Sequence, residues 1–582
     1  MLSPPAPHNA NGFLIFDLGI TLIGIALGYA WPTIGLRLFR TIERTFISLA
    51  RKKGLSVIVV GLSVILFRLA ILPIHPIPRP FAPDDFSFLL AANTFASGRL
   101  ANPTPAMWHS FETLHVTMNP TYMSMYFPGQ GLLLAAGTLF LGNPWFAVLI
   151  VTSLMCAAIC WMLQAWLPPN WALLGGLIAV LHLGLFTYWV NSFTGAAQLA
   201  AIGGALVLGA LPRFLRHPRF RHSLIMGIGM VLMAYSRPYE GVLLCLPVCV
   251  VLIRWIFKGK NRLTGWALMR CATPPLVLVV AAGAWMGYYD YRAFGKATAL
   301  PYTVNRAQYA VAPYYVWQDQ RPDPGYRHNE LRAFYYDNEL PFYTKIHKPS
   351  GFIPYTFLKF MQTLMFYAGF ALIPPLIMIR RVFLDRRIRF LIIGMIVLAA
   401  GMVIEIFLIP HYLAPFTCAF FAIGLQCLRH LRLWRPGGKP VGLGMVRMLL
   451  SVCVLMAGIR LYSEQLHFLI HQYPPGDWTV NWYGPAAHFG EPRANILAQL
   501  DKIPGKHLVI VRYSTRHETL NEWVYNWADI DNSKVVWAQE MDAAHNQELM
   551  QYYKDRQVWL VEPDLKTVTL EPYPQPAVGA PR

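Results

Sequence analysis

Apolar stretches of about 20 residues recur along most of this chain and constrain its fold more than any other feature. A helix of about that length crosses a hydrocarbon layer about 30 Å thick, so each stretch is a candidate membrane span. Charged residues make up 13% of the 582 residues, whereas soluble domains carry roughly 25%. One large water-soluble core would need a charged shell that this composition does not supply. The sequence therefore predicts a polytopic α-helical membrane protein.

We expect about twelve transmembrane helices, each identified by its apolar length. The segments lie near 13–35, 55–75, 145–166, 171–190, 196–212, 223–236, 241–257, 270–288, 356–379, 390–409, 414–428 and 442–463. No basic residue precedes the first segment, so we expect it to be a retained helix and not a cleaved signal.

Basic residues gather in alternate connections between these segments, and this pattern predicts their orientation. The clusters lie in 37–53, 213–221, 258–262, 380–389 and 429–439. The positive-inside rule places such connections in the cytoplasm. The opposite, non-cytoplasmic face then receives residues 76–144 (loop 1), residues 289–355 (loop 2) and the tail from about 464. The net charge of +20 follows this membrane pattern, so we expect membrane lipids and no nucleic acid as partners.

The C-terminal tail differs in character from the rest of the chain. Short apolar runs at 507–513, 534–538 and 557–562 predict buried strands, and 543–554 predicts a helix. This alternation indicates a small parallel α/β domain on the non-cytoplasmic side. The expected organisation is 1–54 as an extra span with a basic loop, 55–463 as the transmembrane catalytic module, and 464–582 as the α/β domain.

Loop 1 carries two adjacent acids, Asp84 and Asp85, shortly after a predicted membrane exit. Acids beside hydrocarbon are costly, which favours a functional role. Either acid could instead cap the helix that follows, because Asp is a favoured N-cap residue. The spacing alone leaves both interpretations open.

The segment 102–131 favours the functional interpretation. It is long, irregular and rich in aromatic and polar residues, among them Glu112, His115, Tyr122 and Tyr126. Disordered segments contain few aromatics, so a folded binding surface is the better prediction. Glu112, His115 and His109 lack the tight spacing of a metal motif, and no protein-built metal site is predicted.

The acidic pair, the aromatic loop ending in Tyr126-Phe127-Pro128-Gly129 and the late turn His411-Tyr412-Leu413-Ala414-Pro415 resemble the GT-C superfamily. These are membrane glycosyltransferases such as protein O-mannosyltransferases and lipid A aminoarabinose transferases. Asp84 and Asp85 match the family's acidic pair, and Phe88 matches an aromatic position where Tyr is commoner. The resemblance covers roughly 55–463 and implies a GT-C-like fold. The extra N-terminal span and the α/β tail depart from the family, so the acceptor is not carried over.

The resemblance implies transfer of a hexose or pentose from a polyprenyl-phosphate donor to an acceptor hydroxyl at the non-cytoplasmic face of the inner membrane, with inversion. Asp84 would act as the general base, an effect worth roughly 10²–10⁴-fold. Asp85 would orient the acceptor, assist Asp84 or hold a divalent cation; no cofactor is otherwise implied. The acceptor can be a glycan, a lipid or a protein.

The departing lipid phosphate needs cationic and polar partners, and Arg suits this role by its planar fork. Arg237, His411 and Tyr412 are the predicted phosphate-binding residues. Arg306 in loop 2 is a candidate substrate contact, for which a structural role is the favoured alternative. Arg237 could instead be an interfacial residue paired with Glu240. His411 could be an ordinary interfacial histidine.

The main alternative is a lipid or sugar transporter or flippase without transferase activity. Transporters usually show internal repeats and a binding site near the midplane of the membrane. No repeat is evident in this sequence, and the informative residues gather in the loops. The transferase interpretation is therefore favoured.

Overall fold

The computed structural model describes residues 10–194, 196–259, 262–462 and 490–574. Within this part of the chain, seven helices are long and apolar enough to cross a membrane. They are α3 (Lys53–Ala70), α6 (Pro144–Trp166), α9 (Ala197–Arg216), α11 (Pro238–Lys258), α12 (Gly265–Phe294), the helix Pro410–Arg432 that joins η5 (Pro410–Phe416) to α19 (Thr417–Arg432), and α20 (Val441–Leu461). The pair Pro349–Leu372 (α16) and Pro374–Leu384 (η4 and α17) is long and apolar enough only when taken together, and it is bent by 97°, as a broken span or a re-entrant loop is.

Shorter apolar helices account for the remaining predicted segments. They are the part Ile15–Ala30 of α1 (Ala10–Ala30), α7 (Pro169–Ala179) with the π-helix η2 (Val180–Gly184) and α8 (Tyr188–Asn191), α10 (Phe220–Ala234) and α18 (Arg389–Val403). The protein is thus a multi-pass helical membrane protein. One apolar helix was not expected: α5 (Pro128–Leu141) lies within loop 1. Its 14 residues are too few to be recognised as a span by length.

The helices differ in how they meet their surroundings. α12 has 30 residues and points apolar side chains such as Leu276 and Val280 outward, as a lipid-facing helix does. α9 is instead buried among α6, α10 and η5. Small residues allow this close approach. At Gly204 an added Cβ would lie 1.7 Å from the Pro415 carbonyl oxygen, so η5 packs directly on the α9 backbone.

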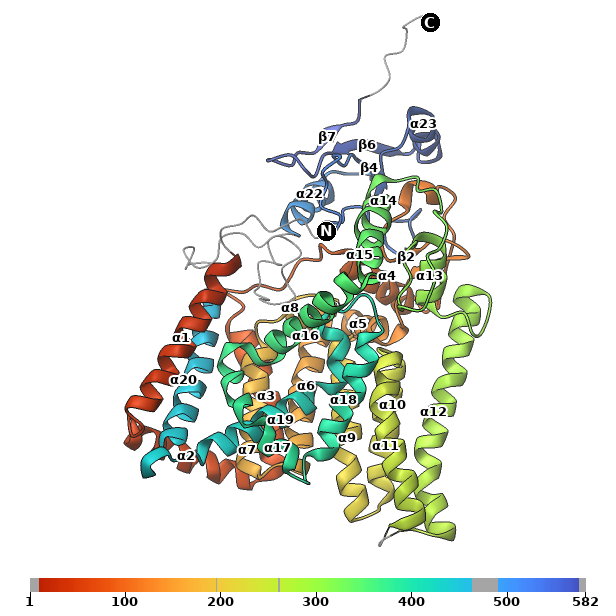
Figure 1. Ribbon diagram of the computed structural model, residues 1–582. Helices are drawn as coiled ribbons and strands as arrows, with labels where there is room; N and C mark the ends of the chain where they lie inside the picture. The colour runs from red at the N-terminus through yellow and green to blue at the C-terminus, as the bar shows by residue number, and fades with distance from the viewer. Residues whose placement is uncertain (1–9, 195, 260–261, 463–489, 575–582) are drawn as a thin grey trace, which may run out of the picture.

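Both long loops fold into compact structure at one end of the helices (Figure 1). Loop 1 contains α4 (Pro83–Ala96), η1 (Trp108–Phe111) and a small antiparallel sheet of order β1-β3-β2, formed by β1 (Asn102–Pro103), β2 (Val116–Thr117) and β3 (Thr121–Ser124). Loop 2 contains α13 (Pro301–Tyr309), α14 (Asn329–Arg332), the π-helix η3 (Ala333–Glu339) and α15 (Leu340–Ile346). Thr121 donates to the Ala293 carbonyl (2.6 Å), so the sheet rests on the end of α12.

The opposite end of the helices carries the basic connections. The helix α2 (Leu36–Arg51), the C-terminal end of α11, the N-terminal end of α12, and α17 (Ile379–Leu384) all lie there (Figure 1). The predicted separation of the basic clusters from the two loops is therefore present in the fold.

The C-terminal domain begins with α22 (Glu491–Lys502) and forms a sheet of order β5-β4-β6-β7. The strands β4 (Lys506–Val511), β5 (Val535–Gln539) and β6 (Arg556–Val561) are parallel, and the short β7 (Glu571–Pro572) is antiparallel to β6. Helix α23 (Ala543–Tyr552) connects β5 to β6. The expected strands and helix are present close to their predicted positions.

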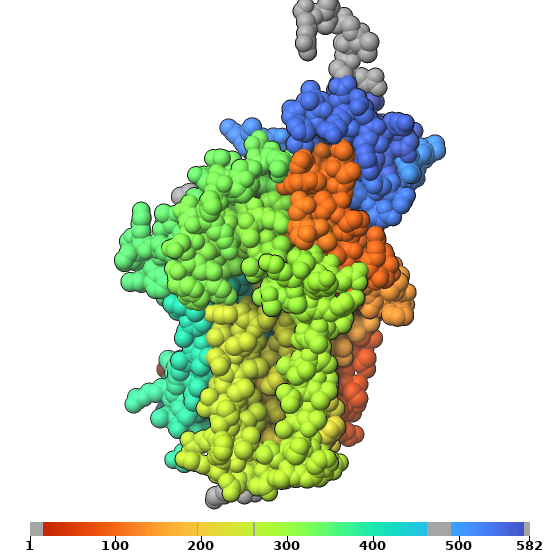
Figure 2. All heavy atoms as spheres, turned by 90° about the vertical axis from the view of Figure 1, so that its right-hand side faces the viewer, coloured from red at the N-terminus to blue at the C-terminus, as the bar shows by residue number. Residues whose placement is uncertain are grey.

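The C-terminal domain packs against loop 1. Phe86 and Leu90 of α4 share one hydrophobic cluster with Leu508 and Ile510 of β4. In Figure 2 the domain (blue) lies against loop 1 (orange), with loop 2 (green) beside them. The domain therefore covers the helix that carries the acidic pair.

Candidate active site

Asp84 lies in the first turn of α4, which begins at Pro83 after the extended residue Ala82. Negative charge is favoured there by the helix dipole. The Tyr126 hydroxyl donates to Asp84 Oδ1, and His115 Nδ1 lies 2.5 Å from the same oxygen. The Asp84 side chain remains 22% accessible. The three side chains thus form one polar group that solvent or a ligand can reach.

The environment keeps Asp84 ionised. Burial raises the pKa of this carboxyl. The charge and hydrogen bond of His115 and the hydrogen bond from Tyr126 together lower it by more, so the net pKa lies below its usual range. Asp84 is therefore a carboxylate at neutral pH and can accept a proton.

Asp85 has a different environment from its neighbour. Its Oδ1 accepts the Phe193 backbone N–H (2.8 Å), and its Oδ2 accepts those of Phe81 (3.3 Å) and Ala82 (3.4 Å). Burial raises the pKa of Asp85 to about 7 despite these bonds. These contacts join the start of α4 to the segment after α8. Asp85 therefore caps the start of α4, which is the alternative role considered for it, and so fixes the position of Asp84.

His115 has a strained backbone. Its φ is 63°, a left-handed conformation that costs a non-glycine residue about 1–3 kcal/mol and is concentrated at functional sites. Its ring stands edge-on to Phe334 (5.4 Å) and to Tyr126 (5.8 Å). Phe88 stacks on Tyr126 at 4.2 Å and so supports the hydroxyl that reaches Asp84.

Arg237 supplies a buried positive charge. It precedes α11 in the turn after α10 and is 8% exposed, with its guanidinium carbon 4.0 Å from the centre of the Tyr412 ring. Its guanidinium makes no hydrogen bond or ion pair with the described residues, whereas its backbone N–H donates to the Met233 carbonyl (2.7 Å). Burial lowers the pKa of Arg237, but Tyr302 and Glu240 raise it more, so the group stays charged.

Loop 1 contacts the turn that holds Arg237. The Gly129 N–H donates to the Tyr235 carbonyl (3.0 Å), and a Cβ at Gly129 would lie 2.6 Å from that oxygen. This close approach brings Tyr126, three residues earlier, toward the α10–α11 turn. The sequence Tyr126-Phe127-Pro128-Gly129 therefore connects the acidic group to the cationic one.

His411 and Tyr412 approach from η5. The Tyr188 hydroxyl and His411 Nδ1 are 2.6 Å apart, and the His411 ring lies 4.9 Å from Tyr412. His411 is 3% exposed. Tyr412 is the residue of this turn whose ring lies against the Arg237 guanidinium.

Two tyrosines of loop 2 complete the site, and the sequence did not indicate them. The Tyr302 ring lies 5.3 Å from Tyr126 and 6.2 Å from Tyr314. Phe334 of η3 is a third aromatic that sequence reasoning missed. None belongs to a motif, so only the fold brings them to Asp84.

Three predicted substrate contacts are bound to other parts of the protein. Glu112 accepts from Tyr309 (3.2 Å) and Arg327 (3.3 Å). The Tyr122 hydroxyl donates to the Asn526 carbonyl (2.9 Å), and Arg306 forms a two-pronged pair with Glu339 (3.1 and 2.8 Å). These residues join the loops and the C-terminal domain to one another.

The described residues contain no group of three or more His, Cys, Asp or Glu side chains arranged to hold a metal ion. At the acidic pair, both oxygens of Asp85 already accept backbone N–H groups. Of the acidic pair, Asp84 is therefore the residue whose carboxylate is not held by backbone N–H groups of the described residues.

No family model matches the chain, and no curated protein matches it. Among solved structures, ArnT from Cupriavidus metallidurans matches with a TM-score of 0.47 at 14% identity, over 87% of this chain and 92% of that chain. The same protein bound to undecaprenyl phosphate matches with a TM-score of 0.45 at 14% identity, over 86% and 92%.

The Archaeoglobus fulgidus oligosaccharyltransferase in the apo form matches with a TM-score of 0.42 at 10% identity. The match covers 79% of this chain and 62% of that chain, so this chain spans less than two thirds of the larger protein. These structural neighbours are GT-C glycosyltransferases, the superfamily that the sequence motifs resemble.

Proposed function

We propose that the protein is a membrane glycosyltransferase that moves a sugar from a polyprenyl-phosphate-linked donor to an acceptor hydroxyl, with inversion. The active end of the helices faces the non-cytoplasmic side, because the basic connections gather at the other end. One structural neighbour was solved with undecaprenyl phosphate and another with a dolichol-phosphate. Both lipids are polyprenyl phosphates, the chemical class of the carrier in this proposed donor.

The observation that carries the proposal is an accessible carboxylate, Asp84, and a buried guanidinium, Arg237, that share Tyr302 and Tyr412 as neighbours. Asp84 is ionised and shared by His115 and Tyr126. The Arg237 guanidinium makes no hydrogen bond with the described residues, although burying a charge without such a partner costs on the order of several kcal/mol. An anionic ligand would offset that cost, and a lipid phosphate lying between loop 1 and η5 meets this requirement.

The reaction is a single displacement. The acceptor oxygen bonds to the anomeric carbon while its proton passes to Asp84, with His115 and Tyr126 holding the carboxylate in place. The bond between the anomeric carbon and the phosphate oxygen breaks at the same time. The lipid phosphate that leaves gains negative charge, which Arg237 stabilises, and Tyr412 orients the guanidinium.

The proposal is tested with Asp84→Asn, using membrane glycolipids and glycans of producing cells compared by mass spectrometry. Asn keeps an oxygen that accepts the Tyr126 hydroxyl, so the fold should be retained. We expect product to fall by roughly 10²–10⁴-fold, the contribution of a general base. The control is Asp319→Asn at an exposed position of loop 2. A transporter would instead yield the same product with altered sidedness of the lipid intermediate.

A further inference from the structure

Glu522 of the C-terminal domain contacts both segments that carry the Asp84–His115 pair. Its backbone N–H donates to the Phe81 carbonyl (2.9 Å), three residues before Asp84. Its carboxylate Oε2 accepts the hydroxyl of Thr113, two residues before His115. Glu522 of the C-terminal domain thus links the segment just before Asp84 to the segment just before His115.

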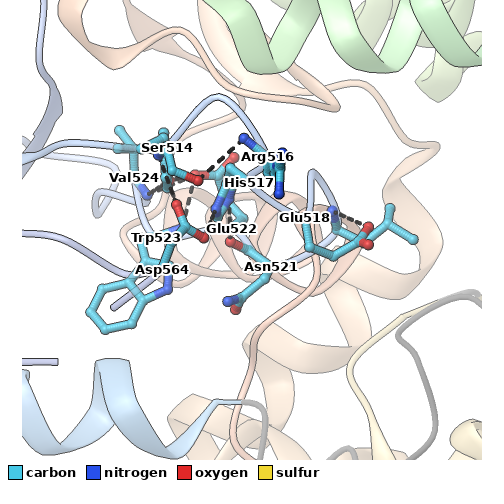
Figure 3. A network of polar contacts seen from close by, with 11 residues as sticks. Ser514, Arg516, His517, Glu518, Asn521, Glu522, Trp523, Val524 and Asp564 are labelled. Atoms are coloured by element: carbon cyan, nitrogen blue, oxygen red, sulfur yellow. Dashed lines mark hydrogen bonds and ion pairs between the residues drawn. The ribbon is translucent and has the colours of Figure 1, made fainter. Parts of the chain in front are cut away.

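The Glu522 carboxylate is held firmly on its own side. Oε1 accepts the Tyr513 hydroxyl (2.8 Å) and the backbone N–H groups of Trp523 (2.9 Å) and Val524 (2.7 Å). Figure 3 shows Glu522, Trp523 and Val524 within a polar network that also includes Ser514, His517 and Asp564. Glu522 is 5% exposed. A buried carboxylate with four donors has little freedom, so the contact to Thr113 is a rigid one.

The rest of the interface keeps the domain in register with α4. Tyr525 stacks on Phe86 at 4.7 Å, and the Ala528 N–H donates to Asn93 Oδ1 (3.0 Å). Phe86 and Asn93 are two turns apart on the helix that begins beside Asp84. The domain therefore contacts α4 along its length.

We propose that Glu522 is a positioning residue that sets the separation of Asp84 and His115, so that the C-terminal domain completes the active site without touching substrate. This inference rests on the proposed function for its kinetic consequence. A mere anchor for the domain would affect stability alone, whereas a positioning residue also affects the ionisation of Asp84.

The expected sign follows from the environment of Asp84. The groups that face it are His115 and Tyr126 from loop 1, Tyr302 from α13, His411 and Tyr412 from η5, and Asp85 on its own helix. Burial raises the pKa of Asp84, and the His115 contact is the largest influence that lowers it. Loss of the Thr113–Glu522 bond loosens the His115 segment, although the Ser87 hydroxyl (2.7 Å) and the Met125 N–H (3.1 Å) still donate to the His115 carbonyl. His115 then shifts from Asp84, and the pKa of Asp84 rises. As the pH is lowered, activity should then begin to fall at a higher pH than in the wild type.

The experiment measures transfer from an undecaprenyl-phosphate-linked sugar to native membranes across the pH range, using the full-length protein in nanodiscs. Glu522→Ala and Thr113→Val should each lower kcat about tenfold and move the acid limb about one pH unit upward, with donor KM changed less than twofold. Glu522→Gln still accepts the Thr113 hydroxyl and should restore most of the activity. The double variant Glu522→Ala/Thr113→Val should lose no more than either alone, because both remove one contact.

Asp564→Asn is the matched control. Asp564 belongs to the same network, accepting the Ser514 N–H (2.8 Å) and pairing with His517 (2.7 Å), but both contacts stay inside the domain. Its pH profile should equal that of the wild type. Thr113→Val tests the contact from the loop side even where Glu522→Ala does not fold.

Hydrogen exchange gives a readout independent of transfer. The segments 81–85 and 112–116 should exchange faster in Glu522→Ala than in the wild type, and unchanged exchange would overturn the inference. An active wild type with folded variants that keep its pH profile and kcat would also overturn it. A wild type that transfers no sugar at any pH would instead refute the proposed function.

Discussion

Replacing Arg237 with Gln should weaken lipid-phosphate binding and leave the fold intact. The guanidinium is buried against Tyr412 and makes no hydrogen bond with the described residues. A hydrogen bond to a charged group contributes about 1.5–3 kcal/mol, and the planar fork of Arg can make two such bonds to one phosphate. Losing a total of about 3 kcal/mol weakens binding about 100-fold, at about 1.4 kcal/mol per tenfold.

The chain offers a closely matched control in Arg213. Its guanidinium carbon also lies 4.0 Å from a ring centre, that of Trp161, at the opposite end of the helices. Arg213 differs by donating to the carbonyls of Gly209 (2.6 Å) and Trp161 (2.8 Å). Arg213→Gln should therefore lower stability by about 1–3 kcal/mol and leave affinity unchanged, the reverse of Arg237→Gln.

The assay is the thermal unfolding of each variant in nanodiscs, with and without undecaprenyl phosphate. A ligand that binds only the folded state raises stability by RT ln(1 + [L]/Kd), so the size of the ligand-induced shift reports affinity. Arg237→Gln should unfold near the wild-type temperature without lipid and show a much smaller shift with it. An undiminished shift would refute the role assigned to Arg237, as would equal effects in the two variants.

Two further changes address the acidic group and the close packing behind it. Tyr126→Phe keeps the stacking on Phe88 but removes a hydroxyl that lowers the pKa of Asp84, so the acid limb of the pH–rate profile should move upward; a downward move would contradict this. Gly204→Ala places a Cβ 1.7 Å from the Pro415 carbonyl oxygen, so η5 must shift, and we expect a loss of about 1–3 kcal/mol in thermal unfolding together with reduced transfer. Gly424→Ala in α19, where an added Cβ meets nothing within 4 Å, should be neutral or slightly stabilising.

The parts of the site that the sequence indicates are those carried by local patterns. Asp84 stands out because an acid beside an apolar segment is costly, and Tyr126 and Tyr412 stand out because they belong to short motifs. Tyr302 and Tyr314 carry no such pattern. Their place at the site depends on how loop 2 folds over loop 1, which pairs residues about 180 positions apart and which no local rule describes.

Polarity alone also does not show where a side chain points. Glu112 and Arg306 occupy loops rich in aromatic and polar residues, as substrate contacts would. In the structure Glu112 forms an ion pair with Arg327, which lies far from it in sequence, and Arg306 forms one with Glu339, which lies on another element. The helix α5 went unrecognised for a related reason, because 14 apolar residues suit a buried helix as well as part of a span.

The length of α12 has a consequence for the setting in which the protein works. Its 30 residues extend about 45 Å, about 15 Å more than a typical hydrocarbon layer. In the proposed orientation, the end of α12 that Thr121 contacts faces the donor, so the length of this helix links the position of the acidic group to the bilayer. A thicker bilayer would enclose more of α12 and bring Asp84 closer to the headgroup plane. The distance between the headgroups and Asp84 that a carrier lipid must bridge would therefore depend on bilayer thickness.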